Sequence, residues 1–215
     1  IAKPMVKPGI VNDDEFRRKK KDPALPLVWQ WNHNPENSLW SVKERKGYLR
    51  LHTSRIDTSF EMARNTLTQR TFGPVCSGTT RIDISGLKEG DFAGLCLLQK
   101  KYGLVGVRVD DGKSYIVMVN AETRRPVEIQ RIPIDQKTIY VKAECDFRDR
   151  ADLGYFFYSL DGISWTPIGN TLHMEYTLME HFMGYRFGLF QYATKQTGGY
   201  ADFDHFYISD KVSFH

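Results

Sequence analysis

The chain has 215 residues, of which 41% are hydrophobic and 26% are charged, and its net charge is +4. This length can bury the core of one large domain, and the composition is that of an ordinary globular protein. No apolar run approaches the roughly 18 residues that a membrane-spanning helix needs. The dense basic run Arg17–Lys21 is typical of a solvated loop, so neither a membrane nor a nucleic acid is an expected partner.

The opening residues, IAKPMVKPGI, lack the basic start and apolar stretch of a secretory signal. The chain begins with Ile rather than Met, so we expect a processed or excised product. Pro4, Pro8 and Gly9 interrupt any periodicity in residues 1–12. The pattern therefore predicts an interdomain linker over residues 1–12 and one folded domain over residues 13–215.

Residues 26–40, PLVWQWNHNPENSLW, place three tryptophans around the polar sequence Asn-His-Asn-Pro. Flat rings beside amides and an imidazole suit a flat polar ligand such as a sugar ring. Bases also stack on aromatic rings, so the rings alone do not select a sugar. The same residues would also serve as an anchor against another domain, with the asparagines bonding turn backbone, or as plain core.

From about Leu39 the chain consists of short alternating runs rich in β-branched and aromatic residues, such as GLVGVRVDDGKSYIVMVN and YRFGLFQY. Asp-Gly pairs at 111–112 and 161–162 lie between such runs, which is a strong hairpin signal. Roughly a dozen strands at this spacing indicate an antiparallel sandwich. The predicted fold is all-β, a jelly-roll β-sandwich of two antiparallel sheets.

The three cysteines, Cys76, Cys96 and Cys145, are odd in number, widely spaced, and in or beside strand-like runs. This spacing argues against a disulfide framework and against a zinc site, whose ligands come in close pairs. Buried free thiols are the prediction.

Strand parity separates core from surface, because successive side chains point to opposite faces. Phe187 and Leu189 form the natural core face of one run, and the valines at 105, 107 and 109 form that of another. The opposite faces include strand glycines, which often mark a close approach by something else. The same faces carry five candidate contact residues for a flat ligand or a partner domain: Tyr102, Arg108, Arg186, Phe190 and Tyr192. The alternative is that these side chains only pack against neighbouring strands.

A glycosidase on such a sandwich needs two carboxylates flanking the scissile bond. The expected pattern Glu-x-Asp-x-x-Glu is absent, since RIDIS supplies only Asp83 and the acids between Glu144 and Asp152 fall on a strand end and turn. No nucleophile elbow or phosphate loop occurs either. The chain by itself is therefore predicted to be non-catalytic, with an autonomous sandwich glycosidase as the least favoured alternative.

Acidic residues lie near both ends of the predicted domain, in NDDEF and in YADFDHFYI. First and last strands of jelly rolls commonly lie side by side. Asp14 and Asp204 are therefore candidate ligands for a structural Ca²⁺, which prefers carboxylate and carbonyl oxygens. The alternative is that these acids are solvated or bind backbone amides.

Three strings, WQWNHNPENSLWSVKERKGYLRL, NTLTQRTFGPVCSGTTRIDISGLKEGDFAGL and HFMGYRFGLFQYATKQTGGYADFDHFYI, resemble the C-terminal concanavalin A-like domain of family 43 glycoside hydrolases. The resemblance runs from about Asp13 to Ile208. In these β-xylosidase and arabinofuranosidase type enzymes the catalytic acids lie on a preceding five-bladed propeller. The resemblance implies a non-catalytic, xylan-associated carbohydrate-binding domain whose partners are xylan-type glycans and that N-terminal propeller. A purely structural domain is the alternative. A secreted or periplasmic bacterial enzyme is favoured over a cytoplasmic one.

In several family members a loop of this domain places an aromatic residue at the rim of the propeller's pocket. The matching segment is HFMGYRF, with Phe182 as first choice and Tyr185 as second. Further residues expected at this rim or at the domain interface are Trp29, Trp31, His33 and Asn34. Gln191 departs from the family's Asn before YATK, which puts any polar contact at that position in doubt.

Overall fold

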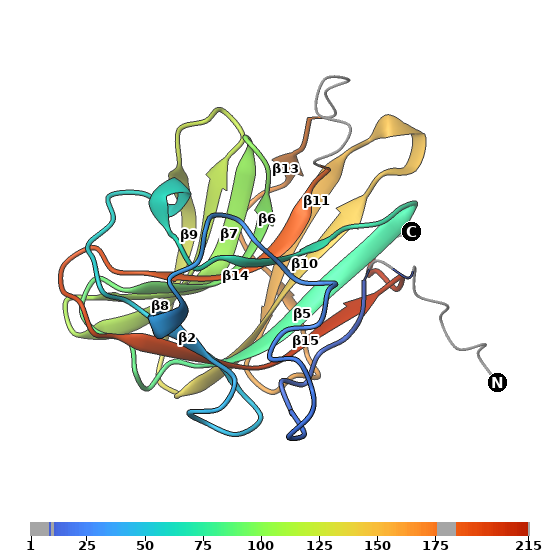
Figure 1. Ribbon diagram of the computed structural model, residues 1–215. Helices are drawn as coiled ribbons and strands as arrows, with labels where there is room; N and C mark the ends of the chain where they lie inside the picture. The colour runs from blue at the N-terminus through green and yellow to red at the C-terminus, as the bar shows by residue number, and fades with distance from the viewer. Residues whose placement is uncertain (1–8, 10, 176–183, 215) are drawn as a thin grey trace.

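The computed structural model describes residues 9, 11–175 and 184–214, and it consists of two antiparallel β-sheets stacked face to face (Figure 1). Sheet I has the strand order β1 (Gln30–Trp31), β4 (Leu67–Arg70), β14 (Arg186–Tyr192), β6 (Phe92–Leu98), β7 (Tyr102–Asp110), β8 (Lys113–Ala121) and β9 (Val127–Ile134). Sheet II has the order β12 (Thr166–Pro167), β11 (Leu153–Ser159), β10 (Thr138–Asp146), β5 (Val75–Asp83), β15 (Tyr200–Ser209), β3 (Leu49–His52) and β2 (Trp40–Ser41), and β13 (Leu172–His173) pairs with β11. The predicted all-β sandwich is confirmed.

Helical structure in the described ranges is limited to three 3₁₀ turns: η1 (Asn37–Leu39), η2 (Phe60–Met62) and η3 (Arg148–Arg150). None of the helices found there has the length and apolar character that crossing a membrane requires.

The turn between β7 and β8 shows how local sequence sets the strand register. Asp111 and Gly112 both have positive φ, 50° and 72°, as a two-residue hairpin turn requires. The pairing then continues without a shift from Asp110↔Lys113 to Tyr102↔Ala121. Every second side chain of β7 therefore points to the same face of sheet I.

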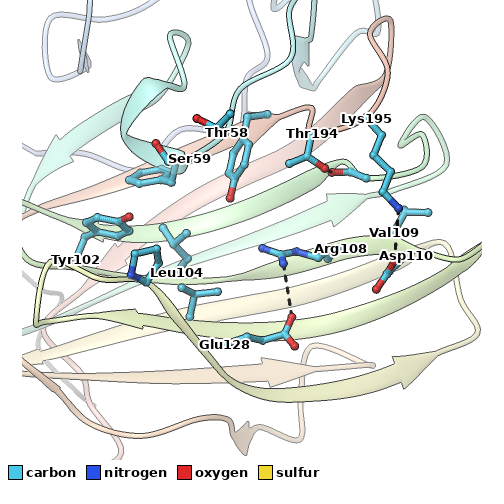
Figure 2. Close-up of a pocket in the computed structure, with 15 residues that line it drawn as sticks. Thr58, Ser59, Tyr102, Leu104, Arg108, Val109, Asp110, Glu128, Thr194 and Lys195 are labelled. Atoms are coloured by element: carbon cyan, nitrogen blue, oxygen red, sulfur yellow. Dashed lines mark hydrogen bonds and ion pairs between the residues drawn. The ribbon is translucent and has the colours of Figure 1, made fainter.

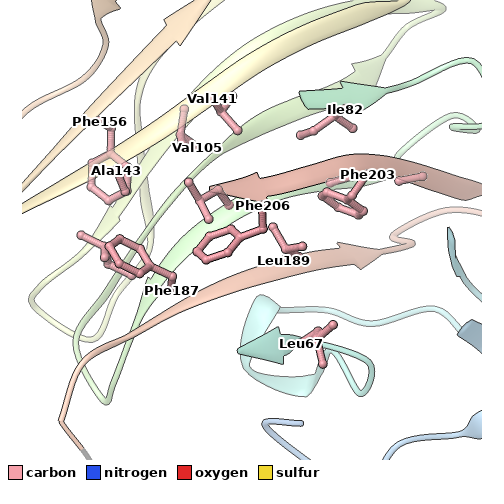
Figure 3. Packing of buried hydrophobic residues seen from close by; sticks show 14 of the residues in the cluster. Leu67, Ile82, Val105, Val141, Ala143, Phe156, Phe187, Leu189, Phe203 and Phe206 are labelled. Atoms are coloured by element: carbon pink, nitrogen blue, oxygen red, sulfur yellow. The ribbon is translucent and has the colours of Figure 1, made fainter. Parts of the chain in front are cut away.

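The main core lies between the two sheets (Figure 3). Phe187 and Leu189 of sheet I meet Phe203 and Phe206 of sheet II there, and all four side chains are fully buried. The rings of Phe187 and Phe206 lie 5.9 Å apart. The strand parity predicted from the sequence is thus correct for β14.

A second apolar cluster covers the outer face of sheet I. Its strand members include Phe92, Tyr102, Phe190 and Tyr192, and Phe60 of η2 lies on top of them. The ring of Phe60 is 5.0 Å from that of Tyr102 and 5.2 Å from that of Phe190. The outer face of this sheet is therefore partly roofed by the segment that contains η2.

The first and last folded segments lie side by side, as predicted. Asp14 forms a β-bridge with Phe206, with N–H···O distances of 2.9 and 2.8 Å. Val11 belongs to the main core, and the side-chain amide of Gln69 binds both backbone groups of Asn12. The folded part therefore reaches back at least to Val11, two residues before the predicted boundary, while residues 1–8 and 10 lie outside the described residues.

All three cysteines are buried and free, as predicted. Cys76 and Cys145 lie directly opposite each other in β5 and β10, whereas Cys96 belongs to the outer cluster of sheet I. Burial raises the pKa of Cys96 and of Cys145, so both thiols stay protonated at neutral pH.

Candidate functional site

A pocket of about 320 Å³ opens on the outer face of sheet I, beside the roof formed by η2 (Figure 2). We call it the sheet I pocket. It is bounded by β7, by the start of β9, and by the segments around residues 58–60 and 194–195. Its polar and aromatic lining includes Thr58, Tyr102, Arg108, Glu128, Tyr192 and Lys195.

Strand geometry brings these side chains together from distant parts of the sequence. Tyr102 and Arg108 are six residues apart on β7 and therefore share a face. Tyr192 reaches the same face from β14, where it is in register with Phe92 of β6. Phe92 in turn pairs with Arg108 of β7. Three of the five ligand-contact residues predicted from parity thus line one pocket.

Arg108 is the central cation of the pocket, and its guanidinium is incompletely satisfied. It lies 4.6 Å from the ring centroid of Phe92, and its Nη1 is 3.7 Å from Oε1 of Glu128 (Figure 2). Its Nε is buried and has no hydrogen-bond partner among the described residues. The Arg108 side chain is 29% exposed, so its guanidinium can meet a ligand oxygen. A small shift that brought Nε to that oxygen would remove the cost of an unsatisfied buried N–H.

The charges of the pocket cancel. Arg131 binds both Asp110 and Glu128 at 3.0 Å, and Lys195 lies 3.8 Å from Asp110. Glu89 lies 3.5 Å from Lys195. In and around the pocket, three cations therefore face three carboxylates: Arg108, Arg131 and Lys195 against Glu89, Asp110 and Glu128. Such a lining suits an uncharged ligand with many hydroxyl groups better than an ion.

The two tyrosines offer hydroxyl groups rather than open ring faces. Tyr102 is 1% exposed and Tyr192 is 6% exposed. Burial raises the pKa of both phenols, so they remain protonated and can donate hydrogen bonds at neutral pH. Stacking of a sugar on these rings is not available, because neighbouring aromatic rings already pack against them.

The remaining two predicted ligand-contact residues lie elsewhere. Phe190 is fully buried under Phe60 and Phe92, so the prediction of a direct ligand contact is wrong for this ring. Arg186 lies outside the pocket, with its Nη1 3.4 Å from Oγ1 of Thr68. Strand parity predicts the sheet face to which a side chain points, but it does not predict whether other segments cover that face.

The residues predicted for a rim or interface are dispersed. Trp29 is part of the main core and packs against Phe16 and Phe206, so its expected surface role is wrong. Tyr185 is also buried, and its hydroxyl accepts a hydrogen bond from the backbone N–H of Glu175 at 3.3 Å. Phe182 lies outside the described residues.

The other residues predicted for a rim or domain interface, Trp31, His33 and Asn34, lie near the surface. Trp31 is half-buried and packs against Trp40, with ring centroids 5.3 Å apart. His33 and Asn34 line an open hollow of about 650 Å³ together with Met62 and neighbouring arginines. His33 Nε2 lies 3.0 Å from the carbonyl oxygen of Glu61. The η2 turn thus separates this hollow, which we call the His33 hollow, from the sheet I pocket.

The carboxylates of Asp14 and Asp204, the predicted calcium ligands, each bind a cationic side chain. The carboxylate of Asp14 binds the guanidinium of Arg18 at 2.8 and 2.7 Å and also accepts the indole N–H of Trp29. Burial alone would raise the pKa of Asp14, but the hydrogen bonds from Arg18 and Trp29 outweigh it and hold the pKa below its ordinary value. Asp204 is paired with Arg81 at 3.1 Å. No group of three or more His, Cys, Asp or Glu suited to a metal occurs within the described ranges.

Some residues that line the sheet I pocket could not be predicted from the alternation of side chains along a single strand. Glu128 and Lys195 reach the pocket only because β9 follows β8 in the sheet and because the segment after β14 folds back over β7. Phe60, which roofs the tyrosines, lies in a segment without any alternation. The sequence offered no signal for these three beyond their polar or aromatic type.

Comparison with known proteins decides the family. Residues 13–209 match the family model described as the beta-xylosidase C-terminal concanavalin A-like domain. The chain belongs to this domain family. It is 30% identical over 217 residues to a beta-xylosidase of Formosa agariphila, in an alignment covering 90% of this chain and 34% of that protein.

Solved structures of family 43 enzymes contain the same domain. A bifunctional GH43-CE protein of Bacteroides eggerthii is 64% identical with a TM-score of 0.93, over 96% of this chain and 26% of that chain. A GH43 glycoside hydrolase engineered to display both endo-xylanase and exo-arabinofuranosidase activity is 29% identical with a TM-score of 0.85, over 98% of this chain and 42% of that chain. The chain thus spans only a quarter to two fifths of the length of the relatives it matches.

Proposed function

We propose that this beta-xylosidase C-terminal domain is a non-catalytic accessory domain that binds neutral xylan-type glycan in the sheet I pocket. Membership of the family supports the enzyme class, because the matched relatives are beta-xylosidases and other family 43 hydrolases. The observation that carries the site is the buried Nε of Arg108, which no described residue pairs with, beside two tyrosine hydroxyls in a pocket whose charges cancel. Sugar hydroxyls can both donate and accept hydrogen bonds, which matches this lining.

Isothermal titration of the 215-residue chain with xylohexaose tests the pocket. Binding heat is expected, and Tyr192→Phe and Glu128→Gln should each weaken the affinity by about 1 kcal/mol for one lost hydrogen bond. Tyr207→Phe, on the outer face of sheet II, is the matched control and should bind like the parent chain. Absence of heat would favour the purely structural role instead.

The proposal extends to a contact between the His33 hollow and the N-terminal catalytic domain. The hollow is open and partly apolar, and Met62 at its edge is 50% exposed, which is typical of a surface that meets another domain. In the full-length enzyme, Met62→Asp should lower Tm and the kcat/KM for xylo-oligosaccharides. Ile163→Asp is the control, because Ile163 is also exposed but lies in the turn after β11 of sheet II. Equal effects of the two variants would place the contact elsewhere.

A further inference from the structure

Two arginines stand side by side on the outer face of sheet I. Arg70 of β4 and Arg186 of β14 are directly opposite each other in the antiparallel register. Arg70 is exposed and Arg186 is half-buried. Like charges at directly opposite positions of a sheet destabilise it, so the pair carries a cost in the free protein.

Neither guanidinium pairs with a carboxylate of residues 11–175 or 184–214. Across the described part of the chain, the contact of Arg186 is the long hydrogen bond to Thr68, and Arg70 has no ion pair. Burial and, after it, the charge of Arg70 lower the pKa of Arg186. Other strand arginines behave differently: Arg50, Arg81 and Arg131 each contact an acidic side chain within 3.1 Å.

The pair lies in the same row as one end of the sheet I pocket. Arg186 is in register with Leu98 of β6, and the pairing Leu97↔Gly103 sets Leu98 beside Tyr102 of β7. Two strand spacings, about 10 Å, therefore separate the backbones of Arg186 and Tyr102. A ligand in the pocket can extend past η2 to the arginines along this row.

We propose that Arg70 and Arg186 bind the carboxylate of a uronic acid unit carried by the glycan. The planar guanidinium presents paired N–H donors that fit a carboxylate better than a neutral hydroxyl. The sheet I pocket cannot select this unit, because its own charges cancel. This proposal rests on the proposed function, in which the sheet I pocket binds the neutral part of the same glycan. The preference for an acidic sugar would come from Arg70 and Arg186, which lie outside that pocket.

Titration with two matched ligands tests the proposal. The chain is titrated with neutral xylotriose and with xylotriose that carries one glucuronic acid unit. The acidic ligand should bind about tenfold more tightly, as one charge-assisted bidentate contact allows. Arg70→Gln and Arg186→Gln should remove this preference. Arg150→Gln removes the same charge at an exposed position in η3 and should keep it.

Each outcome separates this proposal from the previous one. Equal affinity for the two ligands, or a preference lost equally in Arg150→Gln, overturns the uronate site but leaves the neutral pocket standing. Acidic binding that depends on Arg70 without any neutral binding supports the uronate site and removes the pocket. Arg70 is exposed, so its variant should fold even if Arg186→Gln does not. No acid preference, together with a full-length enzyme destabilised by Arg70→Gln, would assign the pair to the catalytic domain and overturn the proposal.

Discussion

The indole N–H of Trp29 donates a hydrogen bond to the carboxylate of Asp14 across 2.8 Å in the interior of the sandwich. The same carboxylate binds Arg18 through both of its oxygens. Through its bridge to Phe206, Asp14 also fixes the start of the domain to the last strand of sheet II. The buried Asp14 therefore accepts hydrogen bonds from a tryptophan and an arginine through its side chain, and its backbone joins the first and last folded segments.

Replacing Asp14 should destabilise the fold. Asp14→Ala leaves the Arg18 guanidinium and the Trp29 N–H without their acceptor, and breaking one side of a buried pair costs about 3 kcal/mol. Urea unfolding at pH 7 measures this change. Asp22→Ala, an exposed acid that binds one backbone N–H, is the control and should cost about 0.5 kcal/mol or less. Equal losses in the two variants would contradict the role given to Asp14.

Calcium should not change the stability of the domain. Asp14 is occupied by Arg18 and Trp29, and Asp204 by Arg81, so neither carboxylate is free to ligate a cation. Thermal unfolding in millimolar Ca²⁺ and in excess chelator should give the same Tm. A lower Tm in chelator would show that ligands other than these two acids bind the ion.

The sequence predicted the sandwich, the hairpin at Asp111–Gly112 and the inward face of β14, because each depends on local spacing alone. It also placed Tyr102, Arg108 and Tyr192 on one face. It could not predict that Phe60 would roof two of them, since the segment around η2 has no periodic pattern. Strand order, which brings Glu128 to Arg108, is likewise a property of the whole sheet rather than of one strand.

Phe60 should stabilise the pocket as well as the fold. Its ring packs on Tyr102 and Phe190 and is almost fully buried, so Phe60→Ala should cost about 3 kcal/mol. Loss of the roof should also weaken xylohexaose binding. Met62→Ala changes the exposed side of the same turn and should cost about 0.5 kcal/mol or less. Urea unfolding and calorimetric titration of both variants measure the two effects.

Close approach of β6 and β7 depends on a pair of glycines in register, Gly94 and Gly106. A Cβ at Gly106 would lie 2.0 Å from the carbonyl oxygen of Ala93, which the backbone can relieve only by moving a strand. Gly106→Ala should therefore cost about 3 kcal/mol or more. A Cβ at Gly112 would have no atom within 4 Å, so Gly112→Ala should cost only the strain of a positive φ, about 1 kcal/mol of stability. Thermal unfolding that ranks the two variants in the opposite order would refute this account.

Asp91 should make the domain less stable as the pH rises. Its side chain is fully buried, and burial raises its pKa from 3.8 to about 6, although the backbone N–H of Lys88 and the amide of Gln191 bind one oxygen. The other oxygen has no partner in the part of the chain that the structure describes. The folded state therefore holds this proton more tightly than the unfolded state, so the contribution to stability is full below about pH 4 and is lost as the pH rises through about 6.

Asp91→Asn should remove that pH dependence. At pH 8 the variant should be more stable than the parent by about 2 kcal/mol, because no buried charge remains, and near pH 3.5 the two should differ little. Urea unfolding at both pH values measures the difference.

Asp161→Asn is a control for which the opposite effect is expected. Backbone N–H groups of Ser164 and Ile163 lower the pKa of Asp161, so this variant should be less stable than the parent at pH 8. A parent and Asp91→Asn pair that differ equally at both pH values would show that folding does not shift the pKa of Asp91.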